Sequence, residues 1–191
     1  MTALMVSLRF LVAMSLLTGG LYPAVVTLAG RLAFPRAADG SLIRTPDGVA
    51  GSELIGRQFD APGRFWGRPS ATAPDPYRAD ASSGSNLGPS HPDLAAAIEE
   101  RVARWRASDP AQTAPIPVDL VTASASGLDP HITPAGALWQ VPRVARERGM
   151  APEAVERLVR ARIEPPWFGF LGGARVNVLL LNLDLDRAPP G

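Results

Sequence analysis

The chain has 191 residues, enough for one folded domain with an appendage but too few for two independent cores. Its 19 basic and 18 acidic residues give a net charge of +1, so the sequence offers no electrostatic footprint for nucleic acid. Cysteine is absent, which excludes disulfides and thiolate chemistry. Every basic residue is arginine, so the lysine of a phosphate-binding loop is missing and any ATP hydrolysis must come from another polypeptide.

Residues 10–30 form an uncharged apolar run. As a helix this run would extend about 31 Å, which matches the hydrocarbon core of a bilayer. A cleaved signal peptide is the alternative, but the run is longer than the apolar region of such a peptide, and the only small-residue cleavage pattern is at residues 27–29. We therefore expect a retained transmembrane helix with a short N-terminal tail over residues 1–34.

Small residues recur four apart inside this span, at Ser15 and Gly19 and again at Gly20 and Ala24. Such spacing lets the backbone of another helix approach closely, although glycine is also simply common in membrane helices. Pro23 removes one helical hydrogen bond, which predicts a kink near Gly19. Arginines flank both ends of the span, so the side of the membrane that holds the rest of the chain stays open.

Three further regions follow from composition. Residues 35–51 are rich in Pro, Gly and Asp and are interpreted as a tether with turns. Residues 52–187 are expected to form one soluble domain, and residues 188–191 a disordered tail. The fold class is thus α+β: one N-terminal transmembrane helix followed by a single mixed α/β soluble domain.

The start of the domain favours little regular structure. Residues 54–59 are compatible with a short strand, whereas residues 60–91 contain repeated Pro, Gly and Ser. A loop of this length in a compact domain is usually functional. Its embedded aromatic residues predict that it packs against the core: Phe65, Trp66 and Tyr77.

A helix is expected next, with Ser90 as its N-cap and Pro92 in its first turn. One apolar face recurs at helical spacing, formed by Leu94, Ile98, Val102 and Trp105. The charged residues of the opposite face are interpreted as solvated.

The second half of the domain mixes strands and helices. Residues 118–123 are expected to form a buried strand, followed by a turn and a helix that starts at Thr133 and Pro134. Pro142 is expected to interrupt that helix after about Gln140, with a restart that runs to residue 149.

A further helix should start at Pro152, with Val155, Leu158 and Val159 on related turns. Residues 176–186 alternate in their second half and predict a strand with one wet face. Asp184 and Asp186 would then lie on a solvated edge of that strand.

The sequence predicts no catalytic and no metal site. A Ser/His/Asp arrangement can be drawn from Ser124 or Ser126, His131, and Asp119 or Asp129, which would make the chain a membrane-anchored serine hydrolase. The G-x-S-x-G pattern is absent, however, and loop residues of these types more often form turns. Two isolated histidines, His91 and His131, do not form a zinc site.

The turn of residues 124–129, SASGLD, contains small residues whose backbone N–H groups could surround an anion ahead of a helix. The alternative is an ordinary turn between a strand and a helix. On the residues alone the ordinary turn is favoured.

Five blocks carry a family resemblance: GSELIGRQF (51–59), RPSAT (68–72), SSGSNLGPSHPDL (82–94), PVDLVTASASGLDPHITPAGALWQVPRVARERG (117–149) and GFLGGARVNVLLLNLDLD (169–186). Together, and in this order behind one span, they resemble the KdpC family, the single-span accessory subunits of the Kdp high-affinity potassium-transporting ATPase. Ala125 stands where the family commonly has Gly, and Trp139 where Tyr or Phe is usual.

The resemblance implies a non-catalytic accessory protein of the cell inner membrane. It would assemble with a potassium-channel-like subunit, a P-type ATPase subunit and a very small single-span subunit, in contact with membrane lipid and without nucleic acid. No tightly bound cofactor is expected, and ATP enters only at the level of the complex. The family is described as a catalytic chaperone that raises the nucleotide affinity of the ATPase subunit, and the implied nucleotide contacts here are Gln140, Ser126 and Gly127.

The resemblance also implies that the soluble domain lies on the extracytoplasmic side, as a cap over the potassium entrance. ATP lies on the other side of about 30 Å of hydrocarbon, which a side chain cannot cross. We therefore keep both roles as alternatives: a chaperone that raises ATP affinity, and a cap with no nucleotide contact.

Overall fold

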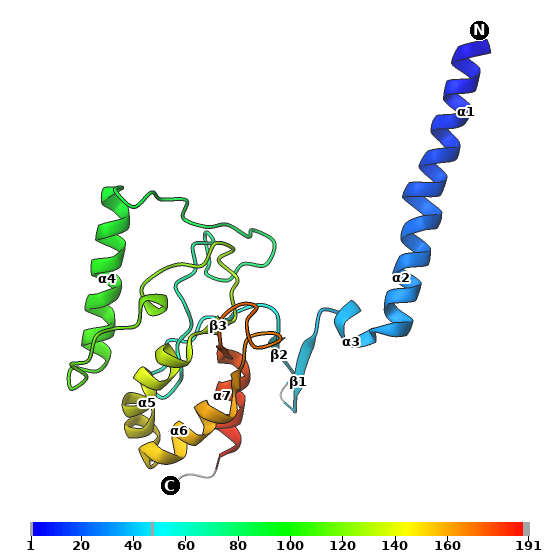
Figure 1. Cartoon of the computed structure of the whole chain (residues 1–191). Helices are drawn as coiled ribbons and strands as arrows, with labels where there is room; N and C mark the ends of the chain where they lie inside the picture. The colour runs from blue at the N-terminus through cyan, green and yellow to red at the C-terminus, as the bar shows by residue number, and fades with distance from the viewer. Residues whose placement is uncertain (1, 47, 189–191) are drawn as a thin grey trace. The chain divides into compact units, whose positions relative to one another are not determined.

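The computed structural model describes residues 2–46 and 48–188 and divides the chain into two compact units, Met1–Ser52 and Glu53–Gly191 (Figure 1). The limits expected for span, tether and domain stay predictions. Of the expected tail, residues 189–191 lie outside the described residues.

The first unit is dominated by one long helical segment. It consists of α1 (Thr2–Leu16), a π-helical turn (Leu17–Leu21) and α2 (Tyr22–Ala33). Pro23 has no N–H, so the Gly19 carbonyl loses the helical hydrogen bond that residue 23 would donate. The preceding residue, Tyr22, donates its N–H to the Leu17 carbonyl, five residues earlier, which is a π-helical bond. A π turn therefore lies at Gly19, where the kink is expected, and the kink itself stays a prediction.

The segment after the span contains more regular structure than turns alone. It holds α3 (Pro35–Ala38) and an antiparallel hairpin of β1 (Leu42–Thr45) and β2 (Gly48–Ser52), with a register shift between Ile43 and Arg44. Hydrogen bonds from the Ser52 hydroxyl to the Gly40 carbonyl (2.7 Å) and within the hairpin hold it together.

The second unit combines four α-helices with a small sheet among its described residues, so the α+β prediction is confirmed (Figure 1). In chain order its elements are α4 (Pro92–Ser108), a 3-10 turn (Val118–Leu120), β3 (His131–Ile132), α5 (Pro134–Arg148), α6 (Pro152–Ala161), β4 (Ile163–Glu164), β5 (Arg175–Asn177) and α7 (Val178–Arg187). The sheet is antiparallel in the order β3-β5-β4. Helices α5, α6 and α7 lie side by side in Figure 1, and residues 53–91 run over this unit without helix or strand.

The helix starts follow the sequence closely. Thr133 caps α5 as expected, because its hydroxyl accepts a hydrogen bond from the Gly136 N–H at 2.9 Å. The cap of α4 is His91 rather than the expected Ser90, and its ring nitrogen accepts from the Asp93 N–H. Three residues of the expected apolar face of α4 are confirmed, since Trp105 is buried and Ile98 and Val102 pack on the core, while Leu94 lies outside the core cluster.

Helix α5 runs through Pro142 without the predicted interruption. Proline in a helix costs about 3 kcal/mol, but burial offsets this cost because Val141, Val144 and Ala145 are all at most 6% exposed. The helix ends where expected, at Gly149 in the left-handed conformation (φ 62°).

Three predicted strands are wrong. Residues 118–120 form a 3-10 turn and residues 121–123 are turn and loop. Residues 54–59 form no strand, and the Gly56 N–H bonds to the Leu128 carbonyl of a distant loop. Residues 176–186 supply only the end of β5 and then α7, because Asn177 caps the Leu180 N–H at 3.1 Å. Leu181 and Leu185 then recur at helical spacing in the core.

Asp184 and Asp186 therefore lie on a helix, and neither is on a solvated strand edge as predicted. Asp184 pairs with Arg162 (2.8 Å), and Asp186 pairs with Arg64 (2.7 Å) and Arg148 (2.8 Å). Both carboxylates tie the end of α7 to other parts of the unit.

Candidate functional site

Two buried carboxamide side chains hold the long loop of residues 53–91 in place. The amide of Gln140 on α5 accepts from the Trp66 N–H (2.8 Å) and donates to the Trp66 carbonyl (3.0 Å). The amide of Asn182 on α7 does the same for Phe65, at 2.9 Å for both bonds. We call Gln140 and Asn182 the carboxamide clamp. Each amide offers a donor and an acceptor, so the clamp makes the backbone hydrogen bonds that a neighbouring strand would otherwise make.

Arginines of α5 bind the same segment just upstream. The guanidinium of Arg143 donates to the carbonyls of Pro62 and Arg64 and to the side chain of Gln140. The guanidinium of Arg148 donates to the Gly63 carbonyl at 2.8 Å. The backbone carbonyls of residues 62–64 thus accept hydrogen bonds from arginine side chains, where in a sheet they would accept them from a neighbouring strand.

Arg143 is buried against tryptophan rings. It is 1% exposed, and its guanidinium lies 4.4 Å from the ring centre of Trp66, which in turn lies 4.8 Å from that of Trp105. Burial lowers the pKa of Arg143 to about 10, which still leaves it charged at neutral pH. A third ring, Trp139, contacts Trp105 edge-on at 5.4 Å.

The predicted nucleotide contact Gln140 lies at the centre of this arrangement. Its side chain is 0% exposed, and both amide atoms are bonded to protein groups, including the Gly136 carbonyl at 3.2 Å. Contact with a ligand would require these bonds to break. The nucleotide role of Gln140 stays a prediction, while its bonds give it a structural role.

The predicted contacts Ser126 and Gly127 form a turn that packs against the long loop. The carbonyl of Ser126 accepts from the Ser83 N–H (3.0 Å), and the Gly127 carbonyl accepts from the Ser70 hydroxyl (2.7 Å). Gly127 has φ 67°, and an added Cβ would lie 2.6 Å from the Ser83 carbonyl oxygen. The glycine is therefore required here by a close backbone approach.

The N–H groups of this turn are partly used within it. The Gly127 N–H bonds to the Ser124 carbonyl, and the Leu128 N–H bonds to the Ser126 hydroxyl at 3.1 Å. These two donors are therefore not directed at an anion. Nucleotide contact through the turn stays a prediction.

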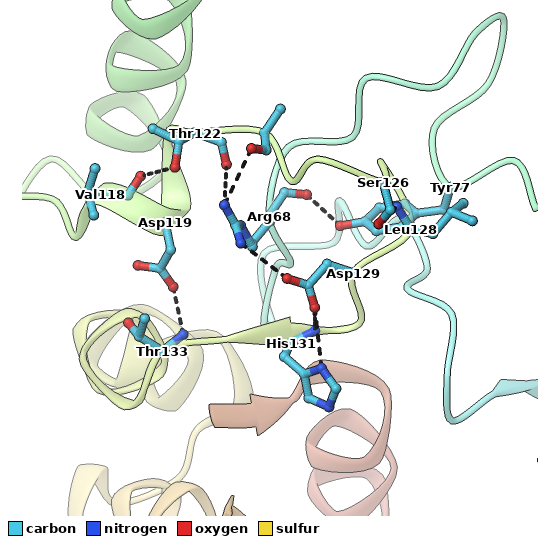
Figure 2. Close-up of polar contacts among 11 residues, drawn as sticks. Arg68, Tyr77, Val118, Asp119, Thr122, Ser126, Leu128, Asp129, His131 and Thr133 are labelled. Atoms are coloured by element: carbon cyan, nitrogen blue, oxygen red, sulfur yellow. Dashed lines mark hydrogen bonds and ion pairs between the residues drawn. The ribbon is translucent and has the colours of Figure 1, made fainter. Parts of the chain in front are cut away.

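A polar network follows directly after the turn (Figure 2). The guanidinium of Arg68 pairs with the carboxylate of Asp129 at 3.1 Å and points toward the carbonyls of Thr122 and Ala123. The other oxygen of Asp129 accepts from the His131 N–H at 3.0 Å and lies 3.3 Å from the ring of the same residue. The network joins the loop at Arg68 to the start of β3.

Two side chains of this network have shifted pKa values. Burial alone would raise the pKa of Asp129, but the hydrogen bonds from His131 and the charge of Arg68 outweigh it, and the net shift is downward. Burial, with a contribution from Asp129, raises the pKa of Tyr77 to about 12. The Tyr77 hydroxyl donates to the Arg68 carbonyl, so it serves as a fixed donor at neutral pH (Figure 2).

The serine hydrolase geometry is not assembled. Asp129 and His131 lie together, but the Ser126 hydroxyl accepts a hydrogen bond within its own turn. Asp119, the other candidate acid, accepts instead from the Thr133 N–H at 2.7 Å ahead of α5 (Figure 2). Across residues 2–46 and 48–188, neither candidate serine is hydrogen-bonded to His131, and no three metal-ligating side chains converge.

A cleft of about 330 Å³ separates the loop from α4. Arg68, Arg101 and Arg104 line it together with Trp66. Arg104 pairs with Asp60, and Arg101 donates to the Val121 carbonyl at 2.9 Å, so both have partners within the chain.

Sequence reasoning found the aromatic residues of the loop but missed what holds them. Packing of Phe65 and Trp66 was expected and is confirmed, since they are 0% and 9% exposed. Arg143 and Asn182 were not singled out. A signal existed for Arg143, because it lies three residues after Gln140 on the helix and so shares its face.

The first unit supplies the other predicted residues. Ser15, Gly19, Gly20 and Ala24 lie on a continuous helical segment, Thr2–Ala33, that is long and apolar enough to cross a membrane. Around Gly19 and Gly20 an added Cβ would meet nothing within 4 Å beyond its chain neighbours and the backbone of its own helix turns. Their role in helix packing stays a prediction.

The two units define the class of protein: a single transmembrane helix joined to a polar α+β unit. Comparison with known proteins identifies the family. The model described as "KdpC: K+-transporting ATPase, c chain" matches residues 4–187. Relatives described as "Potassium-transporting ATPase KdpC subunit" include one from Methylococcus capsulatus, 58% identical with 94% of this chain and 95% of the relative covered. Another, from Methylibium petroleiphilum, is 54% identical with 99% of both chains covered.

The chain belongs to the KdpC family. It is a membrane-associated, non-catalytic subunit of the Kdp potassium uptake ATPase complex. The expected resemblance is thereby confirmed, and the alternative of a serine hydrolase is wrong.

Proposed function

We propose that the chain stabilises the assembled Kdp complex by packing its span against helices of the channel-like, P-type ATPase and small single-span subunits. One observation carries this proposal: from Thr2 to Ala33 the apolar side chains of the span are exposed and without partners in the chain. A span that meets only itself and lipid has its whole surface available for other helices.

The small residues give the proposal a sharp test in the inner membrane. Gly19→Leu adds a large side chain where the chain itself has space, so any loss reflects a neighbouring helix. Val25→Leu, at an exposed position of the same span, is the matched control. Affinity purification of the complex through a tag on this chain should recover less of the partner subunits with Gly19→Leu and normal amounts with Val25→Leu. Equal recovery from both variants would contradict the packing role.

For the second unit we infer a cap on the extracytoplasmic side, over the potassium entrance, with no direct nucleotide contact. The burial of Gln140 and the use of both its amide atoms support this choice over the chaperone that raises ATP affinity. Protease accessibility in cells with a permeabilised outer membrane is the test. Cleavage of the second unit from outside is expected, and protection until the inner membrane is opened would leave the chaperone role as the better proposal.

A further inference from the structure

The loop between β4 and β5 carries an exposed apolar cluster. Trp167 is 65% exposed, Phe168 83%, Phe170 76% and Leu171 51%; we call these four side chains the apolar tip. The loop lies between α6 and α7 in chain order and is drawn in orange in Figure 1. Side chains of this size gathered on a surface mark a contact with another apolar partner.

The loop lacks charge, and its base is held by an ion pair. From residue 165 to residue 174 the sequence is PPWFGFLGGA, without a single ionisable side chain. At the base, Arg175 on β5 pairs with Glu164 on β4 at 3.0 Å. The charged groups of the hairpin therefore lie behind the apolar tip and not within it.

Most backbone N–H groups from residue 167 to residue 171 are hydrogen-bonded within the tip. The Trp167 and Leu171 N–H groups bond to each other's carbonyls at 3.0 and 2.9 Å, and the N–H groups of Gly169 and Phe170 bond within the turn. Pro165 and Pro166 have no N–H to satisfy. Because an unpaired backbone donor is costly in an apolar phase, a tip with internally bonded donors is suited to enter one.

The chain itself keeps the second unit, which carries the tip, near a bilayer. The span ends at Ala33 and the second unit begins at Glu53. The residues between them reach at most about 65 Å when fully extended, and the helix and hairpin within them shorten this reach. The second unit is thus confined to the neighbourhood of the membrane on whichever side it lies.

We propose that the apolar tip inserts into the interfacial layer of the lipid bilayer, as a second and shallow membrane contact beside the span. Tryptophan and phenylalanine are favoured at this depth, with an apolar body in the acyl region and the ring nitrogen of Trp167 near the headgroups. A lipid surface fits better than a protein partner because protein interfaces exchange about one hydrogen bond per 100–200 Å², and the amide donors of residues 167, 169, 170 and 171 are already bonded within the tip. The inference rests on the membrane span and not on the proposed cap or helix packing.

The test uses the one exposed tryptophan. Trp66, Trp105 and Trp139 are at most 9% exposed, so lipid-borne quenchers reach Trp167 selectively. The full chain is placed in nanodiscs of phosphatidylcholine and phosphatidylglycerol, with bromine near the headgroup end or deep in the acyl chains. Wild-type emission should fall with bromine and more with the shallow label, whereas the Trp167→Phe variant should lose almost none.

A second variant and the assembled complex complete the test. Phe168→Ser with Phe170→Ser keeps Trp167 but makes the tip polar, so bromine quenching should fall while the circular dichroism spectrum stays unchanged. Equal quenching of wild type and Trp167→Phe would overturn the proposal. A second result would also overturn the proposal: bromine does not quench Trp167, and Trp167 becomes shielded from aqueous acrylamide only after the other subunits assemble. The partner of the apolar tip would then be a protein and not lipid.

Discussion

Removing one arm of the carboxamide clamp should destabilise the second unit strongly. Gln140→Ala leaves the Trp66 N–H, the Trp66 carbonyl and one Arg143 N–H without their partners at a buried position. An unsatisfied buried polar group costs about 1–3 kcal/mol, and water entering the new cavity recovers part of this. We expect a loss of about 3–5 kcal/mol in the free energy of unfolding, a large fraction of the about 5–15 kcal/mol of a typical domain.

Two further variants separate a structural role from a nucleotide role. Asn182→Ala leaves the N–H and the carbonyl of Phe65 without hydrogen-bond partners in the same way. It should lower the free energy of unfolding by about 2–4 kcal/mol, although no nucleotide role is predicted for this residue. Gln58→Ala removes an exposed glutamine whose side chain bonds to Asp60, and should change stability by no more than about 0.5 kcal/mol.

The assay is equilibrium unfolding of the full chain in detergent micelles, with urea as denaturant and no nucleotide present. Emission from the buried tryptophans reports the loss of the core, because Trp66 and Trp105 lie beside the clamp. Gln140→Ala and Asn182→Ala should both shift the midpoint to lower urea. A Gln140→Ala midpoint equal to that of Gln58→Ala would refute the reasoning and would favour a side chain that is free to bind a ligand.

Two more predictions concern the turn and the network beside it. Gly127→Ala should destabilise the second unit by about 1–3 kcal/mol, because the glycine has φ 67° and the new Cβ would meet the Ser83 carbonyl oxygen at 2.6 Å. Gly172→Ala is the control for backbone conformation alone, because Gly172 has φ 82° but open space around it. Equal urea midpoints for the two variants would contradict the close approach. Asp129→Asn should remove a pH-dependent contribution: the folded pKa of Asp129 is lowered, so its stabilisation is present above the unfolded pKa of about 3.9 and is lost as pH falls through the folded value. The difference between wild type and Asp129→Asn in urea unfolding should therefore shrink from pH 7 to pH 3, and a difference independent of pH would refute the ionic role.

Local signals in the sequence predicted the span and the positions of α4, α5 and α6, whereas α7 was predicted as a strand. Thr133 and Pro152 mark helix starts through capping and proline geometry, which depend on neighbouring residues only. The apolar run of residues 10–30 needs no tertiary context, and the effect of Pro23 on it follows from a missing N–H. Each of these features could be read from a window of a few residues.

The strand predictions were wrong because strands and their alternatives depend on contacts between distant residues. Residues 176–186 satisfy a strand pattern and a helix pattern at once, and the choice depends on the Asn177 cap and on which face meets the core. The clamp was invisible for the same reason, since Gln140 and Trp66 are 74 residues apart. A polar side chain in a helix is normally assigned to the solvated face, and only the structure shows that Gln140 and Asn182 face a strand-like segment.

The use of arginine as the basic residue suits these long-range contacts. Arg143 donates to two backbone carbonyls and one side-chain amide at once, and Arg68 reaches a carboxylate and two carbonyls. A planar guanidinium supplies five donors in fixed directions, whereas a lysine ammonium offers three on a single atom and is desolvated at greater cost. Residues 62–68 of a loop without a strand partner are thus held by such guanidinium groups and by the two carboxamides. We therefore expect substitutions of Gln140, Arg143 and Asn182 to destabilise the second unit more than substitutions of exposed residues within the loop.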